Sequence, residues 1–282
     1  MNTIIVIPAR YNSKRFPGKP LASLEGKAIL ERVWEIASFA ASRIPNCGAV
    51  VATETPSEDC PSEKIISFCE SHGINVVTTS NACRSGSDRV WEVVSKMAEK
   101  PNVVVNLQGD VPTCPPDFIE KLVKSLEANT NASAATIYTK LSWDALDAFR
   151  EAKKASPFSG TSVIVSPKGE ALWFSKNIIP AIRDEKVLRE KTSVSPILRH
   201  IGIYAYRYEA LQFFAGADKG EYERLEQLEQ LRFLENGMKI MAVEGCYPKG
   251  YDKTTSGVDS QEDLERVAEI VRQNGELLSF YR

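Results

Sequence analysis

The stretch "TIIVIPARYNSKRFPGKP", residues 3–20, decides the expected fold and raises the first question about function. Its first part, which ends at Pro8, is an apolar run with the length of a buried strand. Its second part contains no acidic residue, although the net charge of the chain is only −2, and it carries four basic residues: Arg10, Lys14, Arg15 and Lys19. A strand that leads directly into a basic loop predicts an anion-binding turn at the edge of a sheet.

Three further apolar runs in the first half have the same character: "GAVVATE" at 48–54, "INVVTT" at 74–79 and "NVVVNLQGD" at 102–110. The segments between them have apolar residues at helical spacing, as in Ile29, Leu30 and Val33. Strands that alternate with amphipathic helices indicate βαβ units. The sequence therefore predicts an α/β fold, with a mostly parallel sheet and helices on both faces.

The second half is richer in strands. The runs at 161–166, 171–176 and 200–207 predict a small antiparallel extension at about 155–210, serving the substrate or a dimer interface. A long helix is expected over 222–237, stopping at Gly237. A last helix is expected from Ser260 to about Gly275, because Ser260 and Asp263 form a capping-box pattern. We expect residues 1–282 to form a single domain that carries this extension.

The amino-acid composition argues against nucleic acids and membranes as binding partners. The chain has 35 basic and 37 acidic residues, so no general attraction for nucleic acid or an anionic membrane is expected. No apolar segment approaches the roughly 20 residues that cross a bilayer, and no membrane insertion is expected. The six cysteines show no CxxC spacing. Reduced thiols in a cytoplasmic protein are the expected state.

The basic loop has the features of a phosphate cradle. Gly18 permits a close backbone approach, and backbone amides together with the four cations can hold several phosphate oxygens, as in a triphosphate. The loop matches neither the P-loop pattern nor the dinucleotide fingerprint. A solvated basic turn is the alternative that charge alone leaves open.

Two aspartates are candidate metal ligands. Asp110 ends the strand at 102–110, so it should lie at the same sheet edge as the basic loop, and Asp259 precedes the last helix. Two carboxylates that converge on a triphosphate suit Mg²⁺, which takes its remaining ligands from phosphate and water. A loop or capping role is the alternative for Asp259.

The basic loop is similar to the signature loop of the 3-deoxy-manno-octulosonate cytidylyltransferases, the CMP-Kdo synthetases. Four further groups of segments agree in order: "SGSDR" at 85–89, "NLQGD" at 106–110, "RHIGIYAYR" at 199–207 with "LEQLRFLENG" at 228–237, and "GVDSQEDL" at 257–264. The resemblance covers nearly the whole chain. It implies a Rossmann-like nucleotide-diphospho-sugar transferase fold and a homodimer.

The resemblance also implies a reaction. CTP and a 2-keto-3-deoxy sugar acid, Kdo or a close analogue, would give a CMP-sugar and pyrophosphate in the presence of magnesium, for lipopolysaccharide or other surface polysaccharide synthesis. In the family the counterparts of Asp110 and Asp259 bind magnesium. The expected catalytic residues are Arg10, Lys19, Asp110 and Asp259. The expected nucleotide-binding residues are Ala9, Arg10, Ser13, Arg15, Lys19, Ser85, Gly86 and Gln108. A plain helix N-cap is the alternative for Ser85.

The same resemblance implies which residues bind the sugar acid: Arg89, Arg183, His200, Tyr204, Glu229 and Gln230. Strand alternation places His200 and Tyr204 on one face of the strand at 200–207, although a half-buried strand gives the same pattern. Arg183 could pair with the acid's carboxylate, and a surface salt bridge is its alternative.

Three positions depart from the family pattern: Cys83 replaces a usual histidine, Val111 the acidic residue of "GDEP", and Ser162 a common lysine. Because of these departures, a modified ulosonate, such as an amino-substituted one, is an alternative substrate. Two further alternatives are a phosphonate or polyol phosphate acceptor and a nucleotide-binding regulator without catalysis. Pyrophosphate release that depends on a sugar acid would distinguish the enzyme from the regulator.

Overall fold

The computed structural model describes residues 1–13, 15–252 and 257–282. Within these ranges the strands are β1 Thr3–Pro8, β2 Ser23–Leu24, β3 Lys27–Ala28, β4 Cys47–Glu54, β5 Val76–Thr79, β6 Val103–Asn106, β7 Ala134–Ser142, β8 Thr161–Val165, β9 Ala171–Ser175, β10 Val194–Arg207 and β11 Ile240–Glu244. The α-helices are α1 Ile29–Arg43, α2 Glu63–Ser71, α3 Gly86–Lys96, α4 Pro116–Ala128, α5 Trp143–Ala155, α6 Glu185–Lys191, α7 Tyr208–Gly216, α8 Glu221–Glu226, α9 Leu231–Glu235 and α10 Gln261–Asn274. Short 3₁₀ turns occupy Lys19–Leu21 and Leu277–Phe280.

The main sheet has the strand order β11-β7-β10-β6-β1-β4-β5. The strands of the first half pair in parallel, β1 with β4 and β6, and β4 with β5. In the second half β10 pairs antiparallel with β6, β7 and β8, while β11 runs parallel to β7. The predicted α/β sheet with a parallel first half is confirmed.

Helices cover both faces of this sheet, as predicted. The buried strand β6 shows why its sequence is apolar without alternation: Val103 and Val105 pack into the hydrophobic cluster that includes α1 and α4, whereas Val104 packs into the cluster that includes α3 and α7. A strand buried on both faces needs an apolar residue at every position. The polar residues that follow β6 therefore come at the edge of the sheet, where Gln108 and Asp110 lie.

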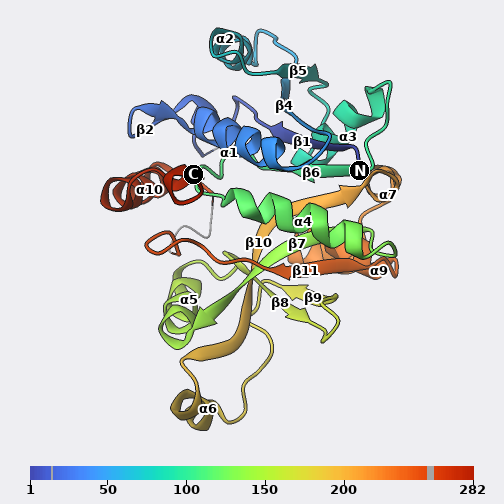
Figure 1. The fold of residues 1–282 in the computed structure, drawn as a ribbon. Coiled ribbons are helices and arrows are strands. Elements are labelled where there is room, and N and C mark those ends of the chain that lie inside the picture. The colour runs from blue at the N-terminus through green and yellow to red at the C-terminus, as the bar shows by residue number, and fades with distance from the viewer. Residues whose placement is uncertain (14, 253–256) are drawn as a thin grey trace.

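The antiparallel extension is also present. Hairpin β8–β9 attaches to β10 through the pairing of β8, and α5 packs on a third hydrophobic cluster with Trp143, Phe149 and Ile197. In Figure 1, β10 runs from α6 at the bottom of the view up to α7, and α5, β8 and β9 lie beside its lower half. No helix in the described ranges is long and apolar enough to cross a membrane.

The predicted long helix at 222–237 is wrong. It is two short helices, α8 and α9, separated at Gln227, whose backbone is left-handed with φ 53° and ψ 43°. The buried Arg232 on α9 donates to the carboxylate of Glu223 on α8 over 2.6 and 2.7 Å, which folds the two helices against each other. Leucines at helical spacing do not reveal such a break. Gly237 does follow the second helix, with a φ of 69°.

Candidate active site

The basic loop folds back on its own backbone. Gly18 adopts a φ of 73°, and its N–H donates to the carbonyl of Tyr11 over 2.9 Å. A positive φ is the conformation that glycine adopts without strain. Lys19 follows Gly18 as the first residue of a 3₁₀ turn and is buried. Lys14 lies outside the described residues.

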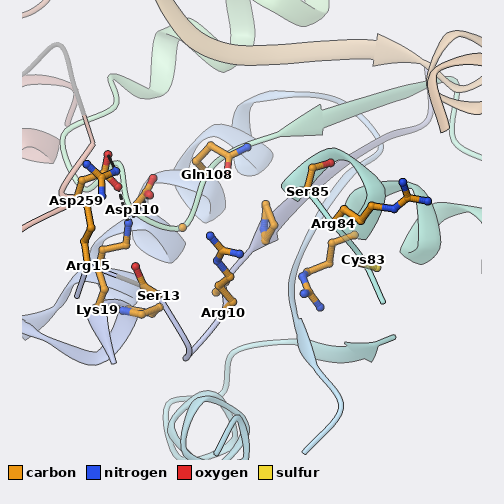
Figure 2. Close-up of a pocket in the computed structure, with 16 residues that line it drawn as sticks. Arg10, Ser13, Arg15, Lys19, Cys83, Arg84, Ser85, Gln108, Asp110 and Asp259 are labelled. Carbon is orange, nitrogen blue, oxygen red and sulfur yellow. Dashed lines mark hydrogen bonds and ion pairs between the residues drawn. The ribbon is translucent and has the colours of Figure 1, made fainter. Parts of the chain in front are cut away.

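A cavity of about 380 Å³ opens beside this loop. It lies between the loop after β1, the loop after β6 and the beginning of α3 (Figure 2). All the residues predicted to bind nucleotide line it: Ala9, Arg10, Ser13, Arg15, Lys19, Ser85, Gly86 and Gln108. Arg84 lines it too and was missed, although its place in "CRSGSDR" is a visible signal. The lining is rich in cations, as a polyphosphate site requires.

The beginning of α3 explains the role of its serine. Ser85 is the N-cap, since its Oγ accepts from the N–H of Asp88 over 3.1 Å, and the side chain of Asp88 in turn accepts from the N–H of Ser85 over 3.2 Å. Ser85 therefore both caps α3 and lines the first cavity. A helix N-terminus with free amides favours an anion. A Cβ added at Gly86 would come within 3.1 Å of Gln108, so a glycine here lets the two loops approach.

The two candidate metal ligands meet at one ammonium group. Lys19 Nζ lies 2.6 Å from Oδ2 of Asp110 and 3.1 Å from Oδ1 of Asp259, and Arg15 lies 3.0 Å from Oδ2 of Asp259 (Figure 2). The N–H of Val258 donates to the Asp110 carbonyl over 2.8 Å, which joins the two loops. The carboxylates come from sequence positions 149 residues apart, and only the fold brings them together.

This arrangement fits a hard divalent cation. One oxygen of each carboxylate contacts Lys19 Nζ, and both side chains remain partly exposed. Mg²⁺ takes few protein ligands and fills its remaining positions with phosphate oxygens and water. In the described part of the chain no cluster of three or more His, Cys, Asp or Glu side chains could hold a metal ion.

Arg89 lines the first cavity but is already paired. Its guanidinium lies 3.5 Å from the carboxylate of Glu54 and donates to the hydroxyl of Thr79, and only 4% of the residue is exposed. The side chain therefore holds α3 against the ends of β4 and β5. A contact with the sugar acid, as predicted, would require it to leave Glu54.

A second cavity of about 390 Å³ adjoins the first. The two share Gln108, Asp110 and Asp259, so the carboxylate pair lies where they meet. Four of the predicted sugar-side residues line the second cavity: His200, Tyr204, Glu229 and Gln230. Its size lies within the usual range of small-molecule sites, about 300–1,000 Å³.

Glu229 and Gln230 lie in the break between α8 and α9, and this break positions them at the second cavity. Glu229 accepts from the hydroxyl of Ser87 over 2.8 Å, and burial raises the pKa of its carboxyl. Gln230 is buried, and its Nε2 has no hydrogen-bond partner among the described residues. A buried amide donor without a partner is costly unless a ligand accepts from it. Gln230 therefore indicates a polar ligand in the second cavity.

His200 is buried and neutral. Its Nε2 lies 2.9 Å from the hydroxyl of Thr136, and its ring packs against those of Phe174 and Tyr204. Burial, aided by the charge of Lys176, lowers its pKa from 6.5 to about 3. The imidazole is thus an uncharged hydrogen-bonding group at neutral pH and no cation for the sugar acid.

This burial predicts a pH effect on stability. Between about pH 6.5 and 3 the unfolded chain binds a proton at His200 that the folded chain does not, so acidification should destabilise the fold. From pH 7 to 5 the wild type should lose about 2 kcal/mol more of its unfolding free energy than His200→Gln, at roughly 1.4 kcal/mol per pH unit. Urea unfolding at each pH measures this difference. Parallel pH profiles of the two proteins would show that His200 titrates normally.

Arg183 is not brought to the site. It is exposed, lies just before α6 in the extension, and lines neither cavity. Among the three departures from the family pattern, Val111 lines the second cavity and Cys83 the first, where its thiol donates to Glu92 over 3.1 Å. Burial raises the pKa of that thiol to about 11. Ser162 is buried away from both cavities and donates to the Asn177 carbonyl over 2.6 Å.

Comparisons with known proteins agree with this geometry. A cytidylyltransferase family profile matches residues 4–240. The chain is 35% identical to a 3-deoxy-manno-octulosonate cytidylyltransferase of Maricaulis maris, over 99% of this chain and all of that protein. It is 37% identical to one from Vibrio cholerae, over 98% of this chain, and 33% identical to a mitochondrial one from Arabidopsis thaliana, over 95% of this chain and 82% of that protein.

Solved structures show the same likeness. The chain superposes on a CMP:2-keto-3-deoxy-manno-octonic acid synthetase complexed with CTP, with a TM-score of 0.78, 32% identity, and coverage of 97% of this chain and 99% of the other. A Leptospira borgpetersenii cytidylyltransferase, 15% identical with a TM-score of 0.60, shares the fold. With this similarity over almost its whole length, and with the motifs gathered around two adjoining cavities, the chain belongs to the 3-deoxy-manno-octulosonate cytidylyltransferase family.

Proposed function

We propose that this protein transfers CMP from CTP to Kdo or a close analogue and releases pyrophosphate. The observation that supports it most is the position of Lys19, Asp110 and Asp259 at the junction of a cation-lined cavity and a cavity lined by hydrogen-bonding groups. A phosphate chain in the first and a sugar acid in the second would bring the reacting atoms together at this junction. Holding two substrates in line removes much of the barrier of such a reaction.

In the proposed reaction the anomeric hydroxyl oxygen of the sugar acid attacks the α-phosphorus of CTP. The bond from that phosphorus to the bridging oxygen of the β-phosphate breaks, pyrophosphate leaves with the bonding electrons, and the hydroxyl proton passes to solvent. Transfer of this kind depends on alignment and on neutralisation of phosphate charge. Arg10, Arg15 and Lys19 line the first cavity and can hold the phosphates of CTP and the departing pyrophosphate.

We further propose Mg²⁺ as the cofactor, held by Asp110 and Asp259. When bound, it would neutralise phosphate charge and make the attacking hydroxyl more acidic. A dedicated side-chain base is then not required, and we assign none. Lys19, which bridges both carboxylates, keeps them turned toward each other and can exchange one of them for a phosphate oxygen.

The second cavity favours a singly charged acid over a phosphonate or phosphate acceptor. Glu229 lines it without an ion pair among the described residues, whereas the carboxylates of Asp110 and Asp259, which also line it, are paired with Lys19. Like charges at short distance repel, and a dianion is repelled more than a monoanion. Because Val111 also lines this cavity, an acid with a modified sugar ring or chain remains within the proposal.

We also propose that the enzyme is a homodimer built on the antiparallel extension and acts in the cytoplasm, where it would serve lipopolysaccharide synthesis. Large apolar side chains are exposed on the extension: Phe158, Leu172, Val187 and Val194. Exposed apolar side chains gathered on one part of a protein are typical of an interface. A monomeric mass in light scattering at assay concentrations would contradict the dimer.

The test of the activity measures pyrophosphate release at fixed CTP and Mg²⁺ with Kdo, an amino-substituted Kdo and a phosphonate. We expect turnover with a sugar acid, with a CMP-sugar of the matching mass as the second product. Omission of Mg²⁺ should abolish turnover. Binding of CTP without pyrophosphate release for any sugar acid would contradict the catalytic proposal and favour a regulator.

A further inference from the structure

The second cavity has one positively charged lining residue among the described residues, Arg199. It lies on β10 next to His200, and its guanidinium carbon is 5.0 Å from the centre of the Phe149 ring. Within the described ranges the guanidinium has neither an ion pair nor a hydrogen bond. Burial is the main cause that lowers its pKa, and the charge of Arg266 contributes.

Arg199 is half-buried, and the lack of an acceptor for its guanidinium among the described residues sets it apart from the buried arginines of this protein. Arg32, Arg89 and Arg232 are the arginines buried most deeply in the described chain, and each has a carboxylate partner: Glu276, Glu54 and Glu223 respectively. Arginine carries five N–H donors and stays charged, so burial without an acceptor is costly. Arg199 thus has unused donors at the wall of a cavity.

The charges around the cavity make this one cation important. Asp110, Asp259 and Glu229 line the same cavity, and His200 is neutral because its pKa is lowered to about 3. A carboxylate that enters this space meets three groups of its own sign, and within the described ranges only two of them, Asp110 and Asp259, are paired with a cation, Lys19 of the first cavity. Among the described side chains that line this cavity, Arg199 is the one cation that can offset that repulsion. The aromatic ring of Phe149 holds the guanidinium by stacking and leaves its N–H groups free to donate.

We propose that Arg199 binds the carboxylate of the sugar acid. The inference rests on the proposed function and deepens it, since it gives Arg199 the role that the family resemblance had given to Arg183. A planar guanidinium can bind a carboxylate through two parallel hydrogen bonds. In a 2-keto sugar acid the carboxylate is attached to the carbon that bears the attacking hydroxyl. Holding the carboxylate therefore also orients that hydroxyl toward the carboxylate pair at the junction.

The test compares Kdo as substrate with its C1 carboxamide as a competitive inhibitor against Kdo, in the wild type, Arg199→Gln and Arg199→Lys. For Arg199→Gln we expect the KM for Kdo to rise about 100-fold, while the KM for CTP and the inhibition constant of the amide stay nearly unchanged. The preference for acid over amide should therefore disappear. Arg199→Lys should keep part of it, because an ammonium retains the charge and loses the bidentate geometry.

Arg43→Gln is the matched control, because the Arg43 guanidinium also stacks over a phenylalanine, 5.4 Å from the ring of Phe39, but at the end of α1. It should leave both constants unchanged. The inference is overturned if Arg199→Gln keeps the preference for acid over amide. It is equally overturned if the amide and CTP bind more weakly in parallel with Kdo, which marks a structural role, or if Arg183→Gln alone removes the preference. A wild type that releases no pyrophosphate with Kdo contradicts the proposed function itself.

Discussion

Asp110→Asn should lower kcat/KM for the CMP transfer about a thousandfold or more, because the carboxylate is proposed to hold a divalent cation that supplies several kcal/mol of transition-state stabilisation. The substitution keeps the size and shape of the side chain. It removes the negative charge that lies 2.6 Å from Lys19 Nζ at the junction of the two cavities. The loss should fall on the chemical step, since the cations of the first cavity that are proposed to hold CTP are unchanged.

Two measurements separate this role from a structural one. Steady-state rates over a Mg²⁺ titration should show that Asp110→Asn needs far more metal, and Mn²⁺ binding followed by electron paramagnetic resonance should weaken with it. Asp144→Asn, on the exposed first turn of α5, is the matched control and should change neither. Normal Mn²⁺ binding and near-normal turnover in Asp110→Asn would remove Asp110 from the metal site.

Arg232→Ala should lower the free energy of unfolding by about 3–5 kcal/mol, the range found when one partner of a buried ion pair is removed. Glu223 is 2% exposed, and loss of the guanidinium would leave its carboxylate buried without a counter-charge. The carbonyl of Phe214 would lose the donor that now lies 2.6 Å away. Denaturant unfolding measures the change, and Arg272→Ala, which breaks exposed ion pairs, should cost far less.

Arg232→Ala should also weaken binding of the sugar acid in the second cavity. Arg232 joins α9 to α8 on the two sides of the turn that carries Glu229 and Gln230. Loosening this turn should raise the KM for the sugar acid more than the KM for CTP. The double variant Glu223→Leu/Arg232→Met, which leaves no buried charge, should recover part of the stability. A loss below about 1 kcal/mol for Arg232→Ala would mean that water reaches Glu223.

Local sequence was sufficient for the first half of the fold and for the position of the basic loop beside Asp110. The run that ends at Pro8 is apolar at nearly every position because β1 is buried between two layers of helices. A loop that follows such a strand must lie at the sheet edge, so the sequence alone places the basic loop and Asp110 together. The capping box at Ser260 is likewise a local hydrogen-bond pattern, and α10 begins where it predicts.

Tertiary structure decided the features that depend on pairing over long distances. The leucine spacing of 222–237 fits one helix, but the buried pair of Glu223 and Arg232 favours a break at Gln227. Arg89, Arg183 and Arg199 carry the same charge in the sequence, yet they end up paired with a carboxylate, exposed on the extension and unpaired beside a cavity. Periodicity and turn chemistry arise from neighbours along the chain. A charged side chain can form an ion pair within the protein or remain available to bind a ligand. Which of the two occurs depends on which distant groups the packed fold brings within about 4 Å.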